Sequence, residues 1–78
     1  QLVEMIARSL VDHPEQVEVT EVSEDDQIRL ELRVAESDLG KVIGRQGRTA
    51  RAIRTLVATA AEKGGRQGVS FEIIEEAP

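Results

Sequence analysis

Hydrophobic residues at helical spacing begin the chain. Apolar side chains stand at positions 2, 3, 6 and 10, with charged side chains on the opposite side of a helical projection. This pattern is typical of an amphipathic helix. Proline disfavours helical backbone in the residue before it, so the helix should end ahead of Pro14. Residues 17–22 then have the composition of a short strand, and residues 23–27 form an acidic turn.

The clearest strand signal follows that turn. Ile28, Leu30, Leu32 and Val34 alternate with charged residues. Because successive side chains of a strand point to opposite faces, this alternation predicts one buried face and one solvent-exposed face. We therefore expect helices on only one side of the sheet.

The second half of the chain predicts two helices and a last strand. Ser37 or Asp38 can cap a short helix that ends at Ile43, because their side-chain oxygens accept hydrogen bonds from the first free N–H groups. Residues 44–47 interrupt the helical pattern, and a longer helix should cover residues 48–63, ended by Gly64 and Gly65. Its expected buried stripe consists of Ile53, Leu56, Val57 and Ala60.

Residues 69–73 alternate again and predict the final strand. The order helix, strand, strand, helix, helix, strand predicts an α+β fold of two layers, with a three-stranded sheet and three helices on one face. We expect residues 1–78 to form a single domain, since 78 residues leave no room for a second core.

Composition narrows the classes of function. Without cysteine, the chain has neither a disulfide framework nor a thiolate metal site. No apolar run approaches the roughly 20 residues of a membrane span, so we expect a cytoplasmic protein that does not insert into membranes. One Phe and no Tyr or Trp leave no aromatic platform on which bases could stack.

Charge is segregated along the chain. The formal net charge is −5, but residues 1–38 hold three basic and eleven acidic side chains, whereas residues 39–68 hold seven basic ones and a single acidic one. Such a cluster predicts a local site for an anionic ligand rather than general polyanion binding. The alternative is that these cations only solvate a helix surface.

A glycine-rich segment lies inside this basic stretch. Gly44 and Gly47 frame a four-residue Gly-x-x-Gly loop, which precedes the helix that carries Arg48 and Arg51. Glycines allow close approach of the backbone and positive φ angles, and the next helix directs free N–H groups and partial positive charge toward the loop. A P-loop would require Lys and Ser or Thr after its second glycine, and a dinucleotide fingerprint a third glycine; the segment has neither.

These residues resemble a KH domain. The resemblance rests on the string Val42-Ile43-Gly44-Arg45-Gln46-Gly47-Arg48-Thr49-Ala50-Arg51-Ala52-Ile53. The order of the predicted elements is similar to the type II arrangement of the KH family, and the short format is similar to the bacterial KhpA-type RNA-binding proteins. The resemblance covers nearly the whole chain.

The resemblance implies a groove for about four nucleotides of single-stranded RNA. Gly44, Arg45, Gln46 and Gly47 would contact the sugar-phosphate backbone, with the bases in an apolar cleft floored by Val42 and Ile43. Charge and position add three further candidate RNA-binding residues, which are Lys41, Arg48 and Arg51.

A protein-interaction module is the alternative hypothesis. Small residues on the outer face of the long helix leave room for another helix, namely Thr55, Ala58 and Thr59, although such a face is usually plain surface. The resemblance implies homodimers or pairing with a second, KhpB-type KH protein, in the role of an RNA chaperone or post-transcriptional regulator. We expect no enzyme activity, no cofactor and no metal site, because the chain has a single histidine and its acidic turn lacks the ligand spacing of a calcium loop.

Overall fold

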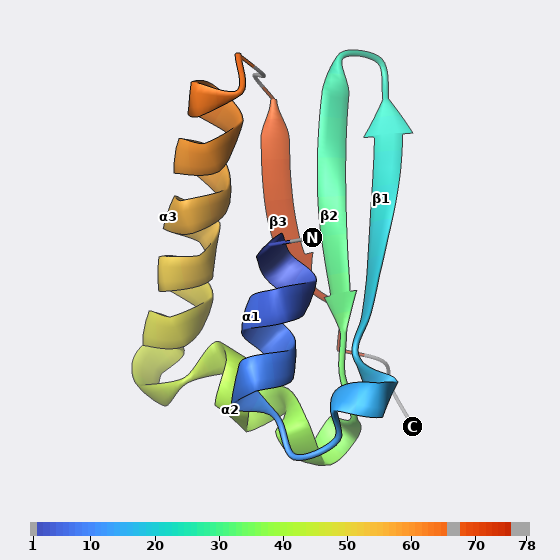
Figure 1. The fold of residues 1–78 in the computed structure, drawn as a ribbon, viewed down its shortest axis with the longest axis vertical. Coiled ribbons are helices and arrows are strands. Elements are labelled where there is room, and N and C mark those ends of the chain that lie inside the picture. The colour runs from blue at the N-terminus through green and yellow to red at the C-terminus, as the bar shows by residue number, and fades with distance from the viewer. Residues whose placement is uncertain (1, 66–67, 76–78) are drawn as a thin grey trace.

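The computed structural model describes residues 2–65 and 68–75 (Figure 1). Its helices and strands follow the predicted order. They are α1 (Leu2–Leu10), β1 (Glu18–Glu24), β2 (Gln27–Arg33), α2 (Leu39–Ile43), α3 (Arg48–Lys63) and β3 (Val69–Ile73). Short 3₁₀ turns precede β1, α2 and α3. The prediction of an α+β fold with three strands and three helices is confirmed.

The three strands form one mixed sheet in the order β1-β2-β3. β1 and β2 are antiparallel and joined by a turn of only two residues, Asp25 and Asp26, which is shorter than the predicted turn. Asp25 has a φ of 53°, a conformation that Asp tolerates better than most residues. β3 pairs with β2 in parallel, and the connection between them contains both α2 and α3.

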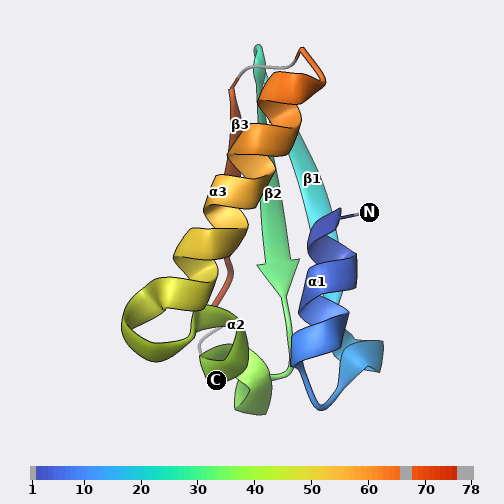
Figure 2. The ribbon, with the colours of Figure 1, turned by 60° about the vertical axis from the view of Figure 1, so that its left-hand side comes forward.

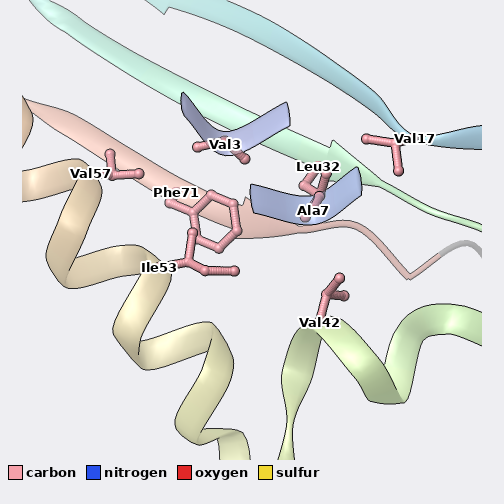
Figure 3. Packing of buried hydrophobic residues seen from close by; sticks show 8 residues of the cluster. All are labelled: Val3, Ala7, Val17, Leu32, Val42, Ile53, Val57 and Phe71. Carbon is pink, nitrogen blue, oxygen red and sulfur yellow. The ribbon is translucent and has the colours of Figure 1, made fainter. Parts of the chain in front are cut away.

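All three helices cover the same face of the sheet, as expected from the alternation in β2 (Figure 2). One hydrophobic cluster joins the two layers (Figure 3). Its buried members are Val3, Ala7, Val17, Leu32, Val42, Ile53, Val57 and Phe71. The opposite face of the sheet is polar, where Arg29 and Arg33 both pair with Glu31 at 3.1 and 3.6 Å.

The buried stripes of α1 and α3 are narrower than predicted. α1 packs through Val3 and Ala7, one helical turn apart, and leaves Leu2 and Leu10 38% and 39% exposed. α3 packs through Ile53 and Val57, whereas Leu56 is 49% exposed and Ala60 is also exposed. Successive residues of an α-helix are rotated by about 100° around its axis, so Leu56 does not point in the buried direction of Val57. The prediction that Leu56 and Ala60 are buried was wrong.

Within the described ranges, no helix combines the length and hydrophobicity needed to cross a bilayer.

Candidate nucleic-acid interface

Gly44 ends α2 and begins the loop. Its N–H donates to the carbonyl oxygen of Gly40 at 2.9 Å, and its backbone then turns to φ 78° and ψ 172°, a region open essentially only to glycine. A Cβ at this position would lie 2.7 Å from Cβ and 2.8 Å from the backbone nitrogen of Thr49. Gly44 is therefore required both for its backbone angles and for the close approach of α3.

The rest of the loop is a single turn with positive φ angles at two successive residues. Gln46 has φ 57° and Gly47 has φ 74°, and the N–H of Gly47 donates to the carbonyl oxygen of Gly44 at 3.2 Å. No side chain caps the start of α3 at Gly47. The N–H of Arg48 donates to the carbonyl oxygen of Arg45, and the partial positive charge at the start of α3 lies next to the loop.

Three arginines lie in this turn or in the first turn of α3 that follows it. Arg45, Arg48 and Arg51 are exposed, and no carboxylate of the described residues lies within ion-pair distance of any of them. Arg48 makes one long hydrogen bond, from Nη2 to Oε1 of Gln46 at 3.5 Å. Their charges are therefore not neutralised by the protein itself.

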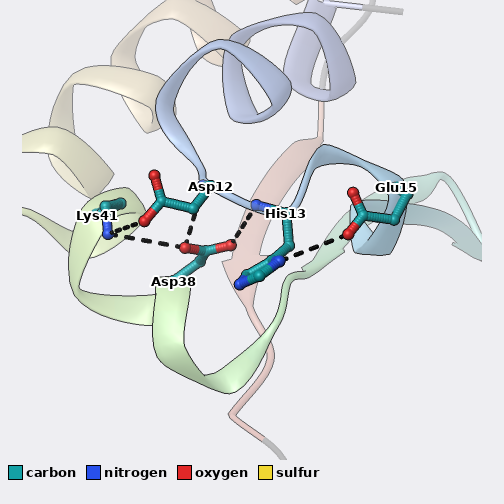
Figure 4. A network of polar contacts seen from close by, with 5 residues as sticks. All are labelled: Asp12, His13, Glu15, Asp38 and Lys41. Atoms are coloured by element: carbon teal, nitrogen blue, oxygen red, sulfur yellow. Dashed lines mark hydrogen bonds and ion pairs between the residues drawn. The ribbon is translucent and has the colours of Figure 1, made fainter.

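Lys41 differs from the three arginines because it already has carboxylate partners. Its Nζ lies 2.8 Å from Oδ2 of Asp12 and 3.8 Å from Oδ1 of Asp38 (Figure 4). The hydrogen bond and charge of Asp12 raise the pKa of Lys41, and those of Lys41 lower the pKa of Asp12. A phosphate group at Lys41 would have to compete with these two carboxylates.

Asp38, one of the two predicted caps of the short helix, has a different role from the predicted one. It precedes α2 as expected of a cap, but its side chain makes no capping bond to that helix. Its fully buried carboxylate instead accepts hydrogen bonds from the backbone N–H groups of Asp12 and His13 at 3.2 and 3.0 Å (Figure 4). Asp38 thus fixes the segment after α1 against the start of α2, the helix that leads into the Gly-x-x-Gly loop.

Val42 and Ile43 differ in their access to solvent. Val42 is fully buried among the core residues of Figure 3, and Ile43 is half-buried. Val42 therefore supports the end of α2 from beneath, while Ile43 keeps some surface beside the loop.

A depression of about 550 Å³ lies between α3 and the start of β3. Among the residues that line it are Arg51, Arg54, Thr55 and Ala58 of α3 and Val69 of β3. Neither Val42 nor Ile43 lines it. Thr59, the third residue of the predicted interaction face, also lies at its edge, so the predicted protein-interaction face and this depression are the same surface.

The α-β-β-α-α-β order, with a Gly-x-x-Gly loop between the second and third helices, defines a type II KH domain. A family model described as "KhpA/KhpB, KH domain" matches residues 1–73. The chain therefore belongs to the KhpA/KhpB family of KH domains.

Several relatives support this membership over nearly their whole length. The RNA-binding protein KhpA of Clostridium perfringens is 57% identical over 74 residues, which cover 95% of this chain and 97% of the relative. The same protein of Clostridium acetobutylicum is 55% identical with the same coverage. That of Aquifex aeolicus is 46% identical over 95% of this chain and 92% of its own length. No solved structure matches the chain.

Proposed function

We propose that this domain binds single-stranded RNA without catalysing a reaction, through the loop formed by Gly44, Arg45, Gln46 and Gly47. The observation that carries the proposal is the geometry of this loop, which has positive φ angles at three residues and leads directly into the N-terminus of α3. Three exposed arginines, none within ion-pair distance of a carboxylate among the described residues, lie in the loop and the first turn of α3. The relatives named RNA-binding protein KhpA support the same ligand class.

The phosphates of the RNA would lie against the loop and contact Arg45, Arg48 and Arg51. The depression beside β3 would receive bases, lined there by Thr55, Ala58 and Val69. Without aromatic side chains in this depression, base recognition rests on apolar contacts and hydrogen bonds rather than stacking. Contacts to about three phosphates imply modest affinity, with a salt slope of roughly −2 for a single strand.

Fluorescence anisotropy with a labelled, mixed-sequence single-stranded RNA at two salt concentrations tests the proposal. The variant Arg45→Asp/Gln46→Asp keeps both glycines and should fold, because Asp tolerates the positive φ of position 46. The control variant Lys63→Asp/Ser70→Asp changes the net charge equally at two exposed positions far along α3 and on the polar face of the sheet. Circular dichroism checks that both variants fold.

The native chain and the control variant should bind RNA, with affinity that falls as salt rises, and the loop variant should not. If all three proteins bound RNA equally, or if none of them bound it, the glycine loop would not be the RNA-binding site.

A protein partner on α3 is the second candidate function. Thr55, Ala58 and Thr59 are exposed small residues, and Leu56 adds an exposed apolar side chain. A homodimer, or a pair with a KhpB-type protein, would cover the depression beside β3 and leave two glycine loops to hold the phosphates of one RNA, as suits an RNA chaperone or post-transcriptional regulator in the cytoplasm.

Sedimentation of the native chain and of Ala58→Arg tests this interaction. Loss of RNA binding in the loop variant with self-association intact would reject a module that only binds protein. If the loop variant bound RNA as tightly as the native chain but no longer self-associated, the RNA proposal would be rejected.

A further inference from the structure

A second depression, which we call the apolar groove, lies on the helical face of the sheet between α1 and the C-terminal half of α3. It has a volume of about 290 Å³ and is lined mainly by apolar side chains. They include Leu2 of α1, Ile28 and Leu30 of β2, Val57 and Ala60 of α3, and Val69 of β3.

The groove exists because α1 covers only part of the sheet. Leu32, near the end of β2, is fully buried, whereas Leu30 and Ile28 point to the same face but stay partly exposed. In Figure 1, α1 starts level with the middle of β2 and runs toward its C-terminal end. Leu2, the first residue of α1, is itself 38% exposed. These side chains therefore form apolar surface that the described residues leave uncovered.

Acidic side chains lie in the groove and beyond one end of it. Glu21 lines the groove, and Asp25 and Asp26 form the turn of the β1–β2 hairpin. Glu24 lies on the opposite face of the sheet, beside Val22 and Arg29. Ile28, which lines the groove, stands two residues after the hairpin turn. Its N–H donates to the carbonyl oxygen of Gly68 at 2.9 Å. Within residues 2–65 and 68–75, no cation lies within ion-pair distance of Glu21, Asp25 or Asp26.

We propose that the apolar groove binds a cationic amphipathic segment of a partner protein. Its apolar side chains would fill the groove over Ile28 and Leu30, and its Lys or Arg residues would meet Glu21 and the hairpin tip. The charge pattern argues against RNA as the occupant, since phosphates would face carboxylates. It also argues against a symmetric dimer through this groove, because Glu21 of each copy would face the groove lining of the other, which contains no cation.

The apolar groove is separate from the glycine loop, although Val69 lines both the groove and the depression beside β3. Ala60 follows Arg48 by twelve residues of α3, which corresponds to about 18 Å along the helix. The partner segment and an RNA at the glycine loop can therefore be bound at the same time.

Three synthetic peptides of about 14 residues test the proposal by titration into the ¹⁵N-labelled chain. The first is an amphipathic Leu/Lys helix, the second replaces each Lys by Glu, and the third scrambles the Leu/Lys order so that no apolar face remains. Only the first should bind, with amide shifts at Ile28, Leu30 and Ala60. Glu21→Lys should weaken its binding about fivefold.

Ala60→Arg should abolish peptide binding by filling the groove and adding a repelling charge, whereas the matched control Ala60→Ser should retain it. Ala60 is exposed, so neither change should lower the melting temperature by more than a few degrees or weaken RNA binding.

Three results would overturn the proposal. The first is equal binding of the scrambled peptide, and the second is shifts confined to residues 24–26, either of which would indicate charge attraction alone. The third is sedimentation that shows self-association of the native chain abolished by Ala60→Arg, because a second copy would then be the occupant.

Discussion

Substitution by alanine should destabilise the domain much more at Gly44 than at Gly47. At Gly44 the backbone angles belong essentially to glycine, which costs another residue on the order of 1–3 kcal/mol. The added Cβ also meets Thr49 at 2.7 and 2.8 Å, an overpacking that costs about 1–3 kcal/mol more. The reduced entropy of the unfolded chain offsets up to about 1 kcal/mol. We expect Gly44→Ala to lower the free energy of unfolding by roughly 3 kcal/mol.

At Gly47 only the backbone conformation opposes the change. Its φ is 74°, and a Cβ there would have no neighbour within 4 Å beyond the two adjacent residues of the chain. The left-handed conformation costs about 1–2 kcal/mol, so Gly47→Ala should cost about 1 kcal/mol after the same entropic offset. Gly40→Ala is the matched control, because Gly40 lies inside α2 with open space around it, and alanine there should stabilise the domain by up to about 1 kcal/mol.

Urea denaturation followed by far-ultraviolet circular dichroism measures these differences, since the chain has no Trp or Tyr to report by fluorescence. For a domain of this size, the gap between the two loop variants corresponds to roughly 10 °C in melting temperature. If Gly44→Ala and Gly47→Ala agreed within about 0.5 kcal/mol, the close contact between Gly44 and Thr49 would not exist in solution.

Three further predictions concern the residues that support the loop. Asp38→Asn should cost about 2 kcal/mol in urea denaturation, because one amide oxygen cannot replace a buried carboxylate that accepts two N–H groups; an unchanged midpoint would contradict this. The pKa of Asp12 is lowered and that of Lys41 is raised. Their contribution to stability is therefore fully present between the ordinary values of 3.8 and 10.5, and it is lost as pH falls through the lowered pKa or rises through the raised one. A melting-temperature difference between the native chain and Asp12→Asn should accordingly shrink at both extremes of pH; a difference that did not change with pH would contradict the ion pair. Leu32→Ala should cost about 2–5 kcal/mol at its fully buried position, whereas Leu56→Ala should cost less than about 1 kcal/mol, and similar values for the two would show that Leu56 is buried in solution.

Local signals in the sequence predicted the elements well. α3 has the predicted bounds because glycines stand on both sides of it and φ turns positive at Gly47 and Gly65. The alternation in β2 correctly indicated which face of the sheet is covered. The parallel pairing of β2 with β3 could not be predicted in the same way, because it depends on the path of the connection between them.

Long-range contacts account for what the sequence did not predict. The bond from His13 to Asp38 joins residues 25 positions apart, and only the packing of α1 beside α2 brings them together. The exposure of Leu56 has a related cause, since helical periodicity indicates a general apolar side but not how much of it the neighbouring elements cover.

The parallel pairing of β2 and β3 has a consequence for how the loop is formed. Ile28 pairs with Val69, forty-one positions later, whereas the β1–β2 hairpin closes over two residues and needs no other part of the chain. The glycine loop belongs to the long connection, whose two ends are held side by side only when β3 pairs with β2. The hydrogen bonds that shape the loop are local, from Gly44 to Gly40 and from Gly47 to Gly44. A ligand that binds only the folded domain would stabilise it by about 2.7 kcal/mol at a hundred times its Kd.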